Sequence, residues 1–160
     1  MVKKLIAVGA ALAGVLLCAQ VHADDTLAIV VGKSSSIDSL SAADLQKIFK
    51  GEKSKAPDGS KVVVVMRDTG SPERDAALAG IYKMSEAEYN KYFLQATFTG
   101  AVQAAPKALS SGAAIKQFVS STAGGIGYVK SSEIDDSVKV VKVDGKAPTD
   151  GDYPIKIGGK

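Results

Sequence analysis

The residues best suited to chemistry lie in one short segment, VVVVMRDTGSPERDAALAGIY, residues 62–82. Its valine run predicts a buried strand, and Ser71 followed by Pro72 predicts the N-cap and first position of a helix. The junction between strand and helix carries two arginines, a glycine and a serine: Arg67, Gly70, Ser71 and Arg74. These residue types at a strand–helix junction indicate a loop that could hold an anion.

An oxyanion fits this loop for three physical reasons. A helix N-terminus leaves backbone N–H groups unpaired and carries partial positive charge. Gly70 permits a tight turn, and the Ser71 hydroxyl could cap the helix or donate to an oxyanion. Either arginine could bind an oxyanion through two parallel hydrogen bonds. The alternative is an ordinary capped helix start, with Arg67 paired to Asp68 and Arg74 facing solvent.

The elements that must position this loop alternate along the chain. Consecutive apolar residues predict strands at 26–31, 61–66, 125–129 and 138–143. Capping serines and apolar periodicity predict helices at 41–50, from Pro72 onward, at 85–96 and at 110–121. The alternation predicts an α/β fold with a mostly parallel sheet flanked by helices. Ligands bind at the carboxyl ends of strands in such sheets, and the loop 67–71 lies at one.

Residues 1–23 are predicted to be a cleaved signal peptide, with a basic start, an apolar centre and small residues before Asp24. Residues 24–160 are then expected to form a single domain, periplasmic or secreted, with no membrane insertion after cleavage. Lipidation at Cys18 is not expected, because Leu17 stands where a lipobox has a small residue. Cleavage would also remove the only cysteine and the only histidine, Cys18 and His22.

The remaining composition argues against several function classes. Of the 20 basic residues, Lys3 and Lys4 would be removed with the signal peptide, which leaves 18 basic and 17 acidic residues. A nucleic-acid binder usually has a clear excess of basic residues, so this near-balance argues against that function. Zinc and other cofactors are not expected, and the acidic turns at 133–136 and 150–152 lack a full calcium-loop pattern. Ser71 fails the Gly-x-Ser-x-Gly pattern and has no histidine base, so we expect no enzyme, with a Ser–Lys pair the one hydrolase alternative.

A long stretch resembles the phosphate-binding protein family of phosphate ABC transporters. The matching motifs are LSAADLQKIFKGEK, the Pro-Asp-Gly turn, the valine strand, the Arg–Gly-Ser loop and AGGIGYV, within residues 38–144. This chain is short for that two-lobed family and resembles mainly one periplasmic-binding-protein-like lobe. The resemblance implies a solute-binding protein in phosphate transport that binds phosphate or a similar oxyanion without catalysis. It also implies an ABC permease as partner, and a second copy of the chain could rebuild the missing lobe.

The resemblance also implies roles for individual residues. Arg67 and Ser71 would contact phosphate, Gly70 would hold the turn, and Arg74 would close the motif. Two positions depart from the family, because Pro72 has no N–H to donate and Glu73 brings a negative charge beside the anion. In place of the missing lobe, Ser34 and Ser35 could donate hydrogen bonds, although a polar connector is the simpler interpretation. The alternative function is an interaction or scaffold module whose anion site has decayed.

Overall fold

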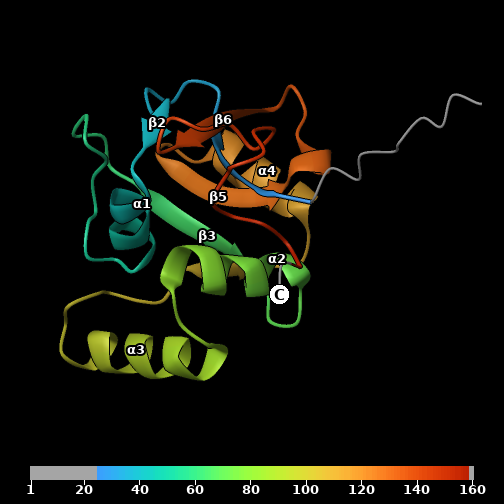
Figure 1. The fold of residues 1–160 in the computed structure, drawn as a ribbon. Coiled ribbons are helices and arrows are strands. Elements are labelled where there is room, and N and C mark those ends of the chain that lie inside the picture. The colour runs from blue at the N-terminus through green and yellow to red at the C-terminus, as the bar shows by residue number, and fades with distance from the viewer. Residues whose placement is uncertain (1–24, 159–160) are drawn as a thin grey trace, which may run out of the picture.

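The computed structural model describes residues 25–158 and shows one twisted sheet with helices on both faces (Figure 1). The predicted signal peptide, with Cys18 and His22, lies outside the described residues. Across residues 25–158, no helix is both long and apolar enough to span a membrane. The mixed α/β architecture agrees with the fold class that the sequence predicts.

The sheet has six strands in the order β2-β6-β1-β5-β3-β4. Their bounds are β1 Leu27–Gly32, β2 Ser39–Leu40, β3 Val63–Arg67, β4 Lys107–Leu109, β5 Gly125–Lys130 and β6 Val138–Val143. Strand β1 runs antiparallel to both β5 and β6, whereas the pairs β2–β6, β3–β5 and β3–β4 are parallel. Five strands therefore share one direction, and β3 and β5 bring their carboxyl ends to the same edge.

Each α-helix begins directly after a serine whose side chain accepts a hydrogen bond from a backbone N–H in the first turn. The helices are α1 Ala42–Phe49, α2 Pro72–Ala77, α3 Glu86–Phe98 and α4 Gly112–Ser121. The capping serines predicted for the first three, Ser41, Ser71 and Ser85, are confirmed. A π-helical turn, Leu78–Tyr82, extends α2 and was not predicted from the sequence.

Alternate residues of the strands point to opposite faces of the sheet and contribute to two apolar layers. On one face Val30 and Val65 pack with Ile115 of α4. On the other face Ile29 and Tyr128 belong to a larger cluster that includes the apolar sides of α1, α2 and α3. Helix α3 contributes Tyr89 and Phe93 to this cluster and leaves Leu94 and Phe98 exposed, at 75% and 91%.

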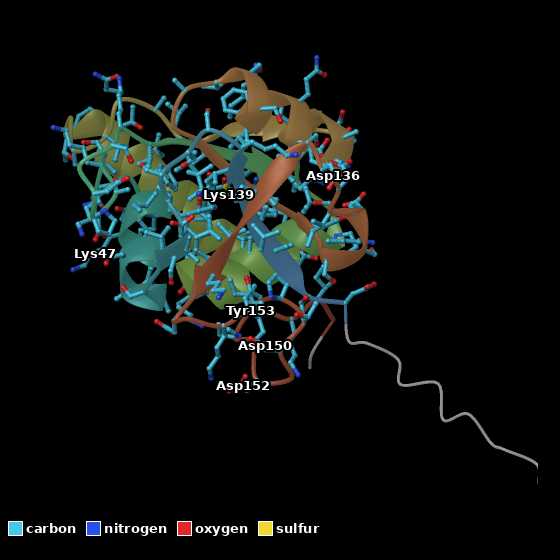
Figure 2. All side chains as sticks on the ribbon, turned by 90° about the horizontal axis from the view of Figure 1, so that it is seen from above. Lys47, Asp136, Lys139, Asp150, Asp152 and Tyr153 are labelled. Atoms are coloured by element: carbon cyan, nitrogen blue, oxygen red, sulfur yellow. The ribbon has the colours of Figure 1, made fainter. Side chains whose placement is uncertain are left out.

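The C-terminal segment closes the larger layer, although the sequence predicted no element there. Leu27 N–H donates to the Ile155 carbonyl at 3.0 Å, and the buried Tyr153 hydroxyl donates to the Leu27 carbonyl at 3.0 Å. Tyr153 is buried, and the exposed Asp152 directly before it lies on an outer turn (Figure 2). The segment is therefore anchored to the start of β1.

Candidate functional site

The candidate site lies where β3 ends at Arg67 and α2 begins at Pro72. Gly70 turns the chain between them with φ of +89°, a conformation that side chains with a Cβ rarely adopt. A Cβ added at Gly70 would meet nothing within 4 Å among the described residues. The backbone conformation, rather than a lack of space, is therefore what favours glycine here.

Arg67 is a mostly enclosed cation with few close partners. Its side chain is 12% exposed; Nη1 donates to the Leu109 carbonyl at 3.5 Å, and Nη2 lies 3.9 Å from Glu73 Oε2. Its Nε is buried without a hydrogen-bond partner among residues 25–158. The Arg67 backbone N–H is fixed by the Tyr128 hydroxyl at 3.1 Å, and burial raises the pKa of that hydroxyl. The backbone of Arg67 is thus held while its guanidinium keeps donors free.

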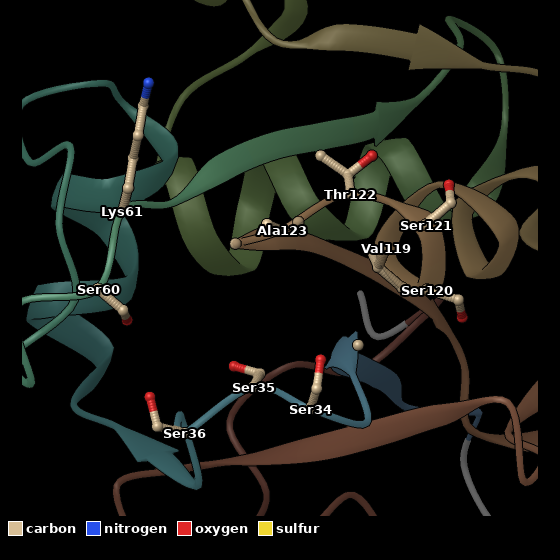
Figure 3. Close-up of a pocket in the computed structure, with 13 residues that line it drawn as sticks. Ser34, Ser35, Ser36, Ser60, Lys61, Val119, Ser120, Ser121, Thr122 and Ala123 are labelled. Atoms are coloured by element: carbon tan, nitrogen blue, oxygen red, sulfur yellow. The ribbon is translucent and has the colours of Figure 1, made fainter.

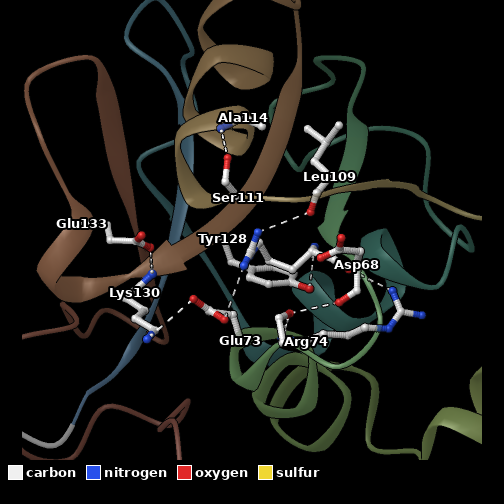
Figure 4. A network of polar contacts seen from close by, with 11 residues as sticks. Asp68, Glu73, Arg74, Leu109, Ser111, Ala114, Tyr128, Lys130 and Glu133 are labelled. Atoms are coloured by element: carbon white, nitrogen blue, oxygen red, sulfur yellow. Dashed lines mark hydrogen bonds and ion pairs between the residues drawn. The ribbon is translucent and has the colours of Figure 1, made fainter.

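Glu73 stands between two cations, one of which the sequence did not single out. The Glu73 carboxylate is buried, with Oε1 3.8 Å from Lys130 Nζ and Oε2 facing Arg67 (Figure 4). Within the described part of the chain, Glu73 Oε2 has no hydrogen-bond partner. Lys130 ends β5, which pairs in parallel with β3. Its position at the end of GIGYVK marks the carboxyl end of a strand, and this is the sequence signal that could have drawn attention to it.

Ser71 and Arg74 are engaged in holding the loop and the helices. The Ser71 hydroxyl accepts from Arg74 N–H at 3.2 Å and donates to the Asp68 carbonyl at 3.0 Å. The Arg74 guanidinium makes two 2.8 Å bonds to Glu86, donates to the Arg67 carbonyl at 3.0 Å and lies 4.8 Å from the Tyr89 ring centre. The Glu86 carboxylate raises the pKa of Arg74, and Arg74 in turn lowers the pKa of Glu86.

Ser34 and Ser35 lie away from the other predicted site residues. They line a hollow of about 580 Å³ together with Ser60, Lys61 and residues of the α4–β5 turn (Figure 3). Lys61 precedes β3, whereas Arg67 ends it, so the hollow and the loop lie at opposite ends of this strand. The structure therefore brings together Arg67, Gly70, Ser71 and Arg74 but separates Ser34 and Ser35 from them.

Comparison with known proteins shows which solved structures have a similar fold. No protein-family model and no curated protein matches the sequence. A solved structure described as a phosphate ABC transporter substrate-binding protein with bound phosphate, from Clostridium perfringens, superposes with a TM-score of 0.62 at 26% identity. The chain is structurally similar to part of a phosphate ABC transporter substrate-binding protein. The match covers 77% of this chain and 47% of that one.

Two further structures give the same result at lower identity. The ABC-type phosphate transport receptor from Vibrio cholerae has a TM-score of 0.62 at 20% identity, covering 78% of this chain and 48% of that one. PstS from Borrelia burgdorferi has a TM-score of 0.63 at 21% identity, covering 83% and 55% respectively. These two establish the fold alone. The chain spans about half the length of the structures it matches, and the predicted resemblance to this family is confirmed.

Proposed function

We propose that this protein binds phosphate or a similar oxyanion, reversibly and without catalysis, at the carboxyl end of β3. The observation that carries the proposal is the mostly enclosed Arg67 guanidinium, whose Nε is buried and lacks a hydrogen-bond partner within residues 25–158. Burying a cation is costly unless it is paired, so a guanidinium with free donors is suited to an incoming anion. The similar fold of a structure described with bound phosphate supports the same ligand class.

The other residues of the junction would have distinct roles. Gly70 supplies the turn, and the Ser71 hydroxyl could donate to an oxyanion by giving up the Asp68 carbonyl. Arg74 would act as a positioning residue, because its donors are taken by Glu86 and by the carbonyl of Arg67. Ser34 and Ser35 follow β1 and line the hollow near Lys61, at the opposite end of β3 from Arg67, so they would not contact the same ion.

The biological setting belongs to the same proposal. An exported solute-binding protein, periplasmic or secreted, would pass phosphate to an ABC permease. A second copy of the chain could cover the open side of the site, because the chain spans about half the length of its structural neighbours. No histidine base is expected near Ser71, since the only histidine of the sequence is His22.

A second candidate function is an interaction or scaffold module without a working anion site. The observation that favours it is the Glu73 carboxylate, which already faces Arg67. The exposed Leu94 and Phe98 on α3 would be the contact residues of such a module. The first candidate function predicts that the protein binds phosphate, whereas the second predicts that it does not.

Isothermal titration of residues 24–160 with phosphate, and with sulfate for comparison, tests the proposal. Arg67→Ala should weaken phosphate binding by about 1.5–3 kcal/mol, the range for hydrogen bonds to charged groups. Lys61→Ala is the matched control, because it removes an exposed cation at the opposite end of the same strand. Unchanged affinity in the Arg67 variant, or a loss in the Lys61 variant, would move the site away from the loop.

A further inference from the structure

Glu73, which is buried, forms a charge cluster with the partly exposed Arg67 and Lys130, and the proposed function leaves the role of this cluster open. We infer that Glu73 is an internal competitor, whose carboxylate occupies the anion position between Arg67 and Lys130, and that Lys130 is the second cation of the oxyanion site. The inference rests on the proposed function of the same site. An oxyanion would bind by displacing the Glu73 carboxylate from between the two cations.

The contacts of Glu73 are loose where those of a neighbouring ion pair are tight. Close ion pairs place nitrogen and oxygen about 2.7–2.9 Å apart, as Arg74 and Glu86 do at 2.8 Å. Glu73 instead lies 3.8 Å from Lys130 and 3.9 Å from Arg67, although its side chain is only 6% exposed. A buried carboxylate held this loosely is stabilised mainly by charge, because neither contact is at hydrogen-bonding distance.

Both sides of the Arg67–Glu73 contact have unused hydrogen-bonding atoms. Arg67 Nε and Glu73 Oε2 are the two buried side-chain atoms among residues 25–158 that lack any hydrogen-bond partner. They belong to the two residues that face each other across this contact. A buried donor left without an acceptor carries a desolvation cost that an incoming oxygen would remove. In the free state the Glu73 carboxylate therefore offsets only part of the positive charge, and the contact is incompletely hydrogen-bonded.

The net positive charge of the cluster favours binding of an anion. Two cations face one carboxylate, so the cluster keeps one net positive charge with Glu73 in place and two when Glu73 swings away. The cations come from the adjacent parallel strands β3 and β5, which end at the same edge of the sheet. A tetrahedral oxyanion has four oxygens and could accept from Arg67 and Lys130 together, which the planar carboxylate does not do at bonding distance.

Phosphate titration of charge variants of the purified protein tests this inference. Glu73→Gln should raise phosphate affinity at least tenfold, because the competing charge is gone while the side-chain shape is kept. Asp75→Asn, an exposed acid in the same first turn, should change affinity less than twofold. Lys130→Met should lower affinity about tenfold, and Lys142→Met, an exposed lysine on β6, should leave it within twofold.

The outcomes separate this inference from the proposed function. Arg67-dependent phosphate binding by the wild type together with unchanged or weaker binding in Glu73→Gln would overturn the internal competitor and leave the proposed function standing. Binding by Glu73→Gln but not by the wild type would support the competitor and reject the wild type as a phosphate carrier. Absence of binding in every variant would overturn both.

Thermal unfolding gives a second readout that a merely misfolded variant would not produce. Without phosphate, Glu73→Gln should melt at a lower temperature than the wild type, because Arg67 and Lys130 lose their shared counter-charge. Saturating phosphate should raise the melting temperature of this variant more than that of the wild type. An equal or smaller rise would show that phosphate does not replace the carboxylate.

Discussion

The Ser71 hydroxyl has a single hydrogen, and in the structure that hydrogen goes to the Asp68 carbonyl at 3.0 Å. Its oxygen meanwhile caps α2 by accepting from Arg74 N–H. Ser71 can therefore contact an oxyanion only by exchanging one hydrogen bond for another of similar strength. Arg67 differs, because an anion would accept a hydrogen bond from its Nε, which has no partner within the described part of the chain. The structural role of Ser71 should accordingly outweigh its contribution to binding.

Ser71→Ala tests this balance at the residue scale. The free energy of unfolding should fall by about 1 kcal/mol, the usual cost of losing an N-cap side chain. Phosphate affinity should fall less than in Arg67→Ala. Ser41→Ala is the control, since Ser41 caps α1 in the same way and should lose similar stability with unchanged affinity. A Ser71 variant that loses as much affinity as Arg67→Ala would make the hydroxyl a principal ligand.

Among the elements, α2 and α3 are joined by polar and ring contacts of Arg74. Its guanidinium bonds both oxygens of Glu86 in the first turn of α3, lies against the Tyr89 ring and also bonds the last carbonyl of β3. One side chain thus ties the end of the strand to two helices. Because the carbonyl it holds belongs to Arg67, the packing of α3 bears on the geometry of the candidate site.

Glu86→Gln should lower the free energy of unfolding at pH 7 by about 2 kcal/mol, between the values for exposed and buried ion pairs. Arg74 lowers the pKa of Glu86 in the folded state, so the stabilisation is fully present above the ordinary glutamate pKa of about 4.3 and is lost as pH falls through the lower folded-state value. Denaturant unfolding at pH 7 and pH 3 should show the two proteins converging in acid. A difference independent of pH would mean that the pair contributes little through its charge.

The sequence predicted the elements whose own residues favour them, and it missed the features that depend on pairing between distant strands. The valines of β3 and the capping serines identify a strand and helix starts by their own chemistry. Strands β2 and β4 are too short for any periodicity, and the antiparallel direction of β1 depends on its partners. Lys130 reaches Glu73 because β5 pairs with β3. The end of GIGYVK marks a strand end in the sequence, but which strand lies beside it is known only from the topology.

For the molecule as a whole, both ends of the described chain meet at the larger apolar layer. The bridge between Thr26 and Lys156 places the C-terminal segment against the start of β1. Ile155 is buried there and presses against Gly80 in the π-helical turn. A Cβ added at Gly80 would lie only 2.8 Å from Ile155 Cγ2, so the close approach requires glycine at this position. The C-terminal segment therefore supports the helix that follows the candidate loop.

A double-mutant cycle on Gly80 and Ile155 tests this packing. Ile155→Ala should cost about 2–5 kcal/mol of unfolding free energy, because it leaves a cavity in the core. Gly80→Ala alone should cost about 1–3 kcal/mol by overpacking against Ile155. The new methyl fits into the space left by Ile155→Ala, so the double variant should be more stable than the sum of the single losses predicts, with a coupling of about 1–3 kcal/mol. Strictly additive losses would place the strain of Gly80→Ala in its own helical turn rather than in its contact with Ile155.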